Sequence, residues 1–206
     1  MSSFLHGLDQ TDVIDITQNH LKGKTNKDVE FLDLSEQNFE TLPRGIENFF
    51  PNLVGIRAYR NNLKRITKDD LKGYKNLKYL NLYNNDITTV ESDLFSLSPK
   101  LQYINFGNNF IRNVARNAFN PLKNLQQLYF HDGKMCINEH ASTRDEIASL
   151  LSNLFVKCPP TYEMFMKDIW EDENFVGKID GMIQKKVEDL EKKIMILEGK
   201  IGIVGK

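Results

Sequence analysis

The side chains able to do chemistry are few and scattered in this chain of 206 residues, which has four histidines and two cysteines. None of them lies in a nucleophile-elbow, zinc-protease or phosphate-loop motif. His131 followed by Asp132 is the one candidate acid–base pair, but adjacent residues of a strand point to opposite faces, so we expect poor alignment unless the chain turns there. His131 and His140 lack metal-ligand spacing. The sequence therefore predicts no catalytic residue, no cofactor and no metal site.

The elements around these residues follow a 24-residue period. Val29, Leu53, Leu77, Leu101 and Leu125 each begin one period, and we count positions within a repeat from them. Positions four, six, eleven and fourteen are also apolar. Such self-similarity predicts stacked repeats over residues 29–135, each with a short strand at about positions three to five. The apolar positions point inward and are buried only when neighbouring repeats stack.

An asparagine recurs at position nine, inside the apolar pattern. It is present in the three middle repeats as Asn61, Asn85 and Asn109, whereas the end repeats have Gln37 and Gly133. An amide both donates and accepts hydrogen bonds, so it satisfies backbone groups that the turn after the strand leaves unpaired in the core. We interpret these asparagines as a structural ladder, and the departures at the ends as features of capping repeats.

Positions two, three, five, seven and eight are expected to project from the concave side of the sheet. Five of the seven tyrosines fall in these columns, and tyrosine is a common hot-spot residue of protein interfaces. The alternative is that the rings stabilise the sheet by cross-strand packing. The predicted ligand-binding face consists of Arg57, Tyr59, Tyr79, Asn81, Tyr83, Tyr103, Asn105, Tyr129 and His131.

Both ends of the repeat array carry predicted caps. Val13–Thr17 alternates and is β-branched, which predicts an edge strand in an N-terminal cap over residues 1–28. At the other end, residues 136–160 predict a helical cap, with a capping box of Thr143 and Glu146 and a stop at the following prolines. Its expected apolar face is Ile147, Leu150, Leu151, Leu154 and Phe155.

The two cysteines lie where a single covalent bond would hold this cap. Cys136 follows the last predicted strand and Cys158 ends the predicted helix, so we expect a disulfide that pins the helix onto the last repeat. Spacing alone does not prove the connection, and two buried thiols in a cytosolic protein are the alternative.

The tail, residues 161–206, carries apolar residues at alternating steps of four and three, which predicts about three heptads of coiled coil. The seam is Ile183, Val187, Leu190, Ile194, Leu197 and Ile201. β-branched residues at a with mostly leucine at d favour a parallel dimer, in which Lys186 faces Glu191 of the partner chain. The alternatives are a helix folded back on the repeats or a frayed tail.

The net charge, the apolar runs and the N-terminal residues limit the possible functions and cellular locations. The net charge of −1 argues against nucleic-acid or membrane-surface binding through overall basicity, and no apolar run is long enough to span a bilayer. Residues 1–13 lack the basic and apolar regions of a secretory signal. Either the protein is cytosolic, or a signal has been cleaved, replaced or lost.

The 24-residue period, the ladder asparagine and the capped end resemble the leucine-rich repeat family over about residues 11–158. The helical cap with its Cys158-Pro-Pro end and the trailing coiled coil narrow the resemblance to secreted insect leucine-rich-repeat proteins, similar in layout to the mosquito leucine-rich immune proteins. The resemblance implies an α/β solenoid that binds proteins outside the cell in recognition or innate immunity, and that pairs with a sister chain. An intracellular repeat scaffold with reduced cysteines is the alternative.

Overall fold

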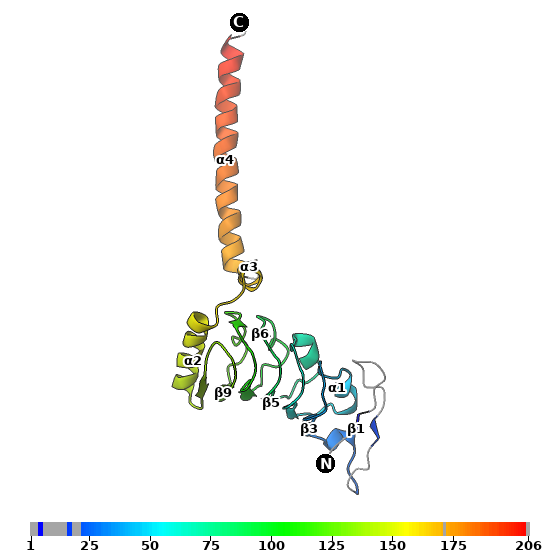
Figure 1. The fold of residues 1–206 in the computed structure, drawn as a ribbon. Coiled ribbons are helices and arrows are strands. Elements are labelled where there is room, and N and C mark those ends of the chain that lie inside the picture. Colours follow the sequence, from blue (N-terminus) through cyan, green and yellow to red (C-terminus); the bar gives the residue numbers. More distant parts are fainter. Residues whose placement is uncertain (1–3, 6–15, 18–21, 171, 205–206) are drawn as a thin grey trace. The chain divides into compact units, whose positions relative to one another are not determined.

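The computed structural model describes residues 4–5, 16–17, 22–170 and 172–204. The chain divides into two compact units, Met1–Met164 and Phe165–Lys206 (Figure 1). The first unit contains the repeats and their cap, and the second is helical. None of the described helices is long and apolar enough to cross a membrane.

A six-stranded sheet runs through the repeats, and its parallel strands lie where the 24-residue period predicts them. They are β3 (Phe31–Asp33), β4 (Gly55–Arg57), β5 (Tyr79–Asn81), β7 (Tyr103–Asn105) and β9 (Gln127–Phe130), several of which are labelled in Figure 1. Each strand pairs in parallel with the strand one repeat away, and the register joins identical positions of neighbouring repeats. The fold is therefore the predicted solenoid.

The core lies on one side of this sheet, because positions four and six of every repeat turn their side chains away from solvent. Position four holds Leu32, Ile56, Leu80, Ile104 and Leu128, all of which are buried. Position six adds bulk toward the C-terminal end, where the rings of Phe106 and Phe130 lie 5.4 Å apart. Phe119 joins them, with its centroid 6.3 Å from that of Phe130. Stacking of repeats thus creates the burial that no single repeat can provide.

The side of the solenoid away from the sheet is closed by short elements that the period does not specify. They are η1 (Asn26–Asp28), α1 (Ile46–Phe49), η2 (Lys68–Leu71) and a second parallel pair, β6 (Thr89–Val90) with β8 (Asn113–Val114). Thr67 and Asp70 cap η2 reciprocally. These pieces bury the apolar residues at position fourteen and beyond, as Val90 and Val114 illustrate.

The C-terminal edge of the sheet carries a strand that the sequence analysis missed. β10 (Glu139–Ala141) pairs with β9 in the antiparallel direction and leads into α2 (Arg144–Lys157). The predicted capping box is present, because Thr143 Oγ1 accepts the Glu146 N–H at 3.3 Å and the Glu146 carboxylate accepts the Thr143 N–H at 3.1 Å. α2 buries Ile147, Leu150 and Leu154 against the last repeat.

One residue of the predicted apolar face of α2 differs from expectation. Phe155 is 42% exposed, because its position lies at the margin of the helix face that contacts the repeats. It lines a shallow pocket with Phe119 and Leu151 instead of packing in the core.

At the N-terminal end, β1 (Phe4–Leu5) and β2 (Ile16–Thr17) pair in a separate two-stranded antiparallel sheet. The predicted edge strand over Val13–Thr17 is described only at its last two residues, and residues 13–15 lie outside the described part of the chain. Within that described part, β3 forms the N-terminal edge of the six-stranded sheet.

The tail is helical, as its heptad pattern predicts. α3 (Tyr162–Trp170) is followed by the long helix α4 (Glu173–Val204), which contains the whole predicted seam. Along the described side chains of α4 the seam residues are substantially exposed, from 42% for Val187 to 57% for Leu197. Ile201 lies in the helix, but its side chain is outside the description.

Candidate ligand-binding face

The open face, as we call the side of the six-stranded sheet opposite the core, is formed by positions three, five and seven. Along β5, Leu80 is buried while its neighbours Tyr79 and Asn81 are partly exposed, and this alternation places the predicted site residues on one face. Because the strands are in register, the residues form columns that cross the sheet.

Aromatic rings form a row across the open face. Tyr79 and Tyr103 are stacked, with ring centroids 4.3 Å apart and planes 12° apart, and Tyr103 continues to Tyr129 at 5.4 Å. Tyr129 stacks on His140 of β10 at 5.7 Å, and Phe31 joins the other end at 6.3 Å from Tyr79. These five residues are the aromatic row. The tyrosine contacts are those that cross-strand packing predicts, and the row also leaves ring edges in solvent.

Two members of this row were absent from the predicted face. Phe31 occupies position three of the first repeat and is 56% exposed, so its position in the column could have identified it. His140 belongs to an antiparallel strand outside the 24-residue period, and no repeat signal could have placed it beside Tyr129.

Glycines in the columns allow rings to lie over the neighbouring repeat. A Cβ atom at Gly55 would collide with the ring of Phe31, and one at Gly107 would come within 2.9 Å of Tyr83 Cδ2. In both cases the aromatic residue precedes the glycine by 24 residues. Each ring therefore crosses the intervening repeat and approaches the aromatic residue two repeats away, as Tyr83 does with His131 at 6.1 Å.

Of the two asparagines predicted on the open face, Asn81 is partly exposed, whereas Asn105 is buried at 8% exposure. Both have a backbone role. Asn81 Oδ1 accepts the Tyr83 N–H at 3.0 Å, and Asn105 Oδ1 accepts the Gly107 N–H at 2.7 Å. Their amide nitrogens point to the tyrosine hydroxyls, with Asn105 Nδ2 lying 3.3 Å from Tyr103 Oη. The oxygen of each amide thus holds the strand exit, a local turn that asparagine favours.

Burial sets the protonation of the central hydroxyl. It raises the pKa of Tyr103 to about 12, although the hydrogen bond from Asn105 acts in the opposite direction. A hydrogen bond with Tyr79 also raises the pKa, so the Tyr103 hydroxyl is protonated at neutral pH.

Charge on the open face is concentrated in the first two repeats. Arg60 forms an ion pair with Glu36 at 2.9 Å, and its guanidinium lies 6.0 Å from the ring of Tyr59. The side chain of Arg57 is exposed and makes no hydrogen bond or ion pair with any described residue, whereas its carbonyl accepts the Leu34 N–H at 2.7 Å. Its strand neighbour in register is Asp33, whose Oδ1 accepts the Ser35 N–H at 3.0 Å.

The His131–Asp132 pair forms because the chain turns at this point. Asp132 has a φ of 65°, which lets its carboxylate reach His131 Nδ1 at 2.6 Å. Position eight adopts this left-handed conformation in every repeat, and Asn84 and Asn108 are examples. β9 ends at Phe130, so the turn that we named as the condition for alignment of this pair is present. Among the residues with described side chains, no group of three or more His, Cys, Asp or Glu could hold a metal ion.

Behind the open face, the position-nine asparagines connect successive repeats. Asn85 Nδ2 donates to Ala58 O at 2.9 Å and to Leu82 O at 3.0 Å, while its Oδ1 accepts the Leu63 N–H at 3.1 Å. Asn61 and Asn109 make the equivalent bonds one repeat away. The amides thus satisfy buried backbone groups of two repeats at once.

Gly133 takes the ladder position in the last repeat for a steric reason. A Cβ there would lie 2.5 Å from Asn109 O and 2.8 Å from Asn109 N. The final turn therefore approaches the backbone of the preceding repeat too closely for an asparagine side chain.

The period, the register and the asparagine ladder agree with the comparison with protein families, in which residues 75–132 match the leucine rich repeat model. The chain is a leucine-rich repeat protein. Proteins of this kind are generally binding scaffolds rather than enzymes. A search of curated proteins finds no match.

Two solved structures match parts of this leucine-rich repeat protein, and the first of them shares its fold. One is the Toll–Spatzle complex, described as a molecular hub in Drosophila development and innate immunity, with 22% identity, a TM-score of 0.50, and coverage of 52% of this chain and 14% of that chain. Another is the leucine-rich repeat domain of mosquito APL1B, with 22% identity, a TM-score of 0.35, and coverage of 53% and 33%. The match thus involves a small part of each of those longer chains.

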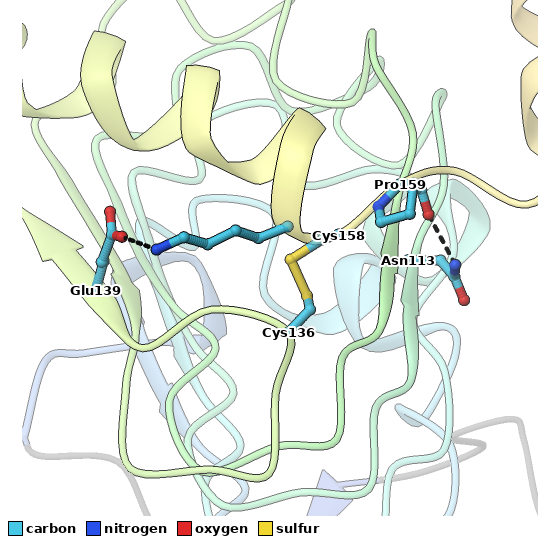
Figure 2. Close-up of a disulfide and its surroundings, with 6 residues drawn as sticks. Asn113, Cys136, Glu139, Cys158 and Pro159 are labelled. Atoms are coloured by element: carbon cyan, nitrogen blue, oxygen red, sulfur yellow. Dashed lines mark hydrogen bonds and ion pairs between the residues drawn. A yellow bond between two sulfur atoms is a disulfide. The ribbon is translucent and has the colours of Figure 1, made fainter.

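A disulfide joins the cap of this leucine-rich repeat protein to its last repeat (Figure 2). Cys136 and Cys158 are bonded, with their Cα atoms 5.2 Å apart. Two further bonds lie beside it: Asn113 Nδ2 donates to Pro159 O at 2.7 Å, and Lys157 Nζ pairs with Glu139 at 2.8 Å. Cys158 is completely buried, and its carbonyl accepts the Val114 N–H at 3.1 Å. The end of α2 is therefore fixed to β8 and to the loop before β10.

Proposed function

We propose that this leucine-rich repeat protein is a non-enzymatic recognition protein that binds a protein ligand on its open face. The observation that carries the proposal is the gathering of five of the seven tyrosines in the exposed columns of the sheet. Exposed aromatic patches on soluble proteins generally mark interaction sites, and tyrosine loses little rotamer entropy when it is covered by a partner.

The test removes ring area from the open face and measures capture of a ligand. The double variant Tyr79→Ala with Tyr103→Ala and a control variant Tyr162→Ala are immobilised and exposed to extracellular fluid of the source organism. Tyr162 is 77% exposed on α3 and lies outside the open face, so its replacement removes an exposed tyrosine of equal size. We expect wild type and control to retain the same partner protein and the double variant to lose it. Equal retention by all three would refute the proposal.

We infer that the protein acts outside the cell, as an extracellular recognition module or innate-immune scaffold. The disulfide supports this, since such bonds persist in oxidising compartments, and the layout resembles secreted insect proteins of immunity. The alternative is an intracellular scaffold with reduced cysteines. Intact mass of protein isolated from its own cells or fluid, alkylated with and without prior reduction, distinguishes the two. Free alkylation of both cysteines in the unfolded chain would favour the intracellular reading.

We further propose that α4 associates with a second helix, either of another copy or of a partner chain. The exposed seam supports this, because apolar side chains such as Ile194, at 54% exposure, gain burial only against another surface. Sedimentation equilibrium of wild type, Leu190→Glu and the control Lys192→Glu tests self-association. We expect dimers for wild type and control, and monomers for Leu190→Glu. A monomeric wild type at high concentration would leave pairing with a different chain as the surviving form of the proposal.

A further inference from the structure

The hydrogen-bonding groups at the centre of the open face are biased toward donors. The amide oxygens of Asn81 and Asn105 are already bonded to backbone N–H groups at 3.0 Å and 2.7 Å. The hydroxyls of Tyr79 and Tyr103 accept from those same amides at 3.4 Å and 3.3 Å. A hydroxyl that accepts a hydrogen bond has its own proton left to donate. Asn105 itself is buried, so the partly exposed donors in this region are the Asn81 amide and the hydroxyls of Tyr79 and Tyr103.

An arginine side chain beside these donors is not engaged by any residue that the structure describes. Arg57 occupies position five of β4 and is the neighbour in register of Asn81. Its side chain is exposed, and no described residue forms a hydrogen bond or ion pair with that side chain. The other arginine of this region, Arg60, is engaged by Glu36 at 2.9 Å. Arg57 thus offers a planar set of donors that matches a carboxylate.

We propose that the ligand of the open face is an acidic protein segment, which places a carboxylate on Arg57 and its carbonyl oxygens on the hydroxyls of Tyr79 and Tyr103. This inference rests on the proposed function and adds the chemical class of the partner. The aromatic row supplies the contact area, and the donors supply the complementarity. A carboxylate satisfies the Arg57 guanidinium, whereas a basic segment would place a second cation against it.

Asp33 gives the inference a second, opposite prediction. It lies beside Arg57 in the neighbouring strand, so its charge offsets part of the attraction that Arg57 exerts on an acidic ligand. Asp33→Asn removes that charge and preserves the Oδ1 that accepts the Ser35 N–H at 3.0 Å. Asn81 and Asn105 make the same bond at the same position of later repeats, so the fold is expected to tolerate the change.

The experiment measures binding of a short glutamate homopeptide to the full chain by isothermal titration calorimetry, with a lysine homopeptide and a heparin fragment as competing probes. We expect the glutamate peptide to bind. Arg57→Gln should weaken it about tenfold, the usual scale for a charge-assisted hydrogen-bonded pair. Asp33→Asn should strengthen it about threefold, as removal of one exposed charge does. The control Arg65→Gln changes the same charge at an exposed residue outside the open-face columns and should have no effect.

A second variant tests the hydroxyl donors without removing the rings. Tyr79→Phe combined with Tyr103→Phe keeps the stacked pair, whose centroids lie 4.3 Å apart, and deletes only two oxygen atoms. We expect it to weaken binding of the glutamate peptide about tenfold. Tyr162→Phe is the matched control and should bind like wild type.

Several results would overturn the inference. They are preference for the lysine peptide, reversed signs for Arg57→Gln and Asp33→Asn, binding of the heparin fragment without the peptide, or no binding of any probe. Failure of the inference is separable from failure of the proposed function. If the glutamate peptide does not bind but alanine at Tyr79 and Tyr103 still abolishes capture of a partner protein, the face binds a ligand of another chemistry. If that capture is also unaffected, both proposals fail.

Discussion

Reduction of the disulfide should destabilise the repeat unit by about 3 kcal/mol. The bond joins residues 22 apart in sequence, and the chain-entropy relation for a loop of that length gives an entropy loss of about 11 cal/mol/K in the unfolded chain. At about 25 °C this corresponds to about 3.4 kcal/mol of stabilisation of the folded state. Reduction deletes no buried side chain, so this cross-link effect is separated from the cavity that a substitution at the buried Cys158 would leave.

The assay is urea denaturation of oxidised and reduced protein, followed by tyrosine circular dichroism. Every tyrosine except Tyr162 lies in the repeats, so this signal follows the repeat unit and not the tail helices. A variant with both Cys136 and Cys158 replaced by alanine is the control and should not respond to the reductant. A difference of less than about 1 kcal/mol between the free energies of unfolding of oxidised and reduced protein would refute this prediction. The disulfide would then not restrict the unfolded chain as the loop-closure relation requires.

Three further predictions concern the ladder, the last repeat and the cap. Asn85→Ala should lower the free energy of unfolding by about 3 kcal/mol, because two buried carbonyls and one buried N–H lose their hydrogen-bond partner. The control Asn62→Ala, at an exposed residue, should lower it by less than about 0.5 kcal/mol. Urea titration of the two variants measures both values. Gly133→Ala should cost more than about 2 kcal/mol, because its Cβ would lie 2.5 Å from the carbonyl oxygen of Asn109, and a loss below about 1 kcal/mol would contradict this. Hydrogen bonds from the backbone N–H groups of Ser142 and Thr143 lower the pKa of the Glu146 carboxyl in the folded protein. Glu146 therefore stabilises the folded state above its unfolded pKa, and this stabilisation is lost as pH falls through the lower folded pKa. In an acid titration of helix content, Glu146→Gln should show a smaller change than wild type.

The periodic part of this fold was predictable because each apolar position repeats in register. Residues such as Leu80 and Ile104 are buried by the same position of the next repeat, so one rule places all five parallel strands. The capping box of α2 was equally predictable, since Thr143 and Glu146 contact each other within one turn. β10 was not, because its pairing with β9 belongs to no repeat. Phe155 was misplaced because a heptad-like pattern gives the direction of a face but not its width.

The open face illustrates a different limit of sequence reasoning. The period assigned Asn81 and Asn105 to the exposed columns, but Asn105 is buried, and the oxygens of both amides accept the backbone N–H two residues later. Only the contacts reveal that each amide presents its donor side to the tyrosine hydroxyls. A sequence predicts which residues share a face, whereas the balance of donors and acceptors on that face depends on local turns. This distinction decides ligand chemistry. The occupied oxygens of Asn81 and Asn105 are not available as acceptors for a ligand, and the proposed acidic segment is consistent with that.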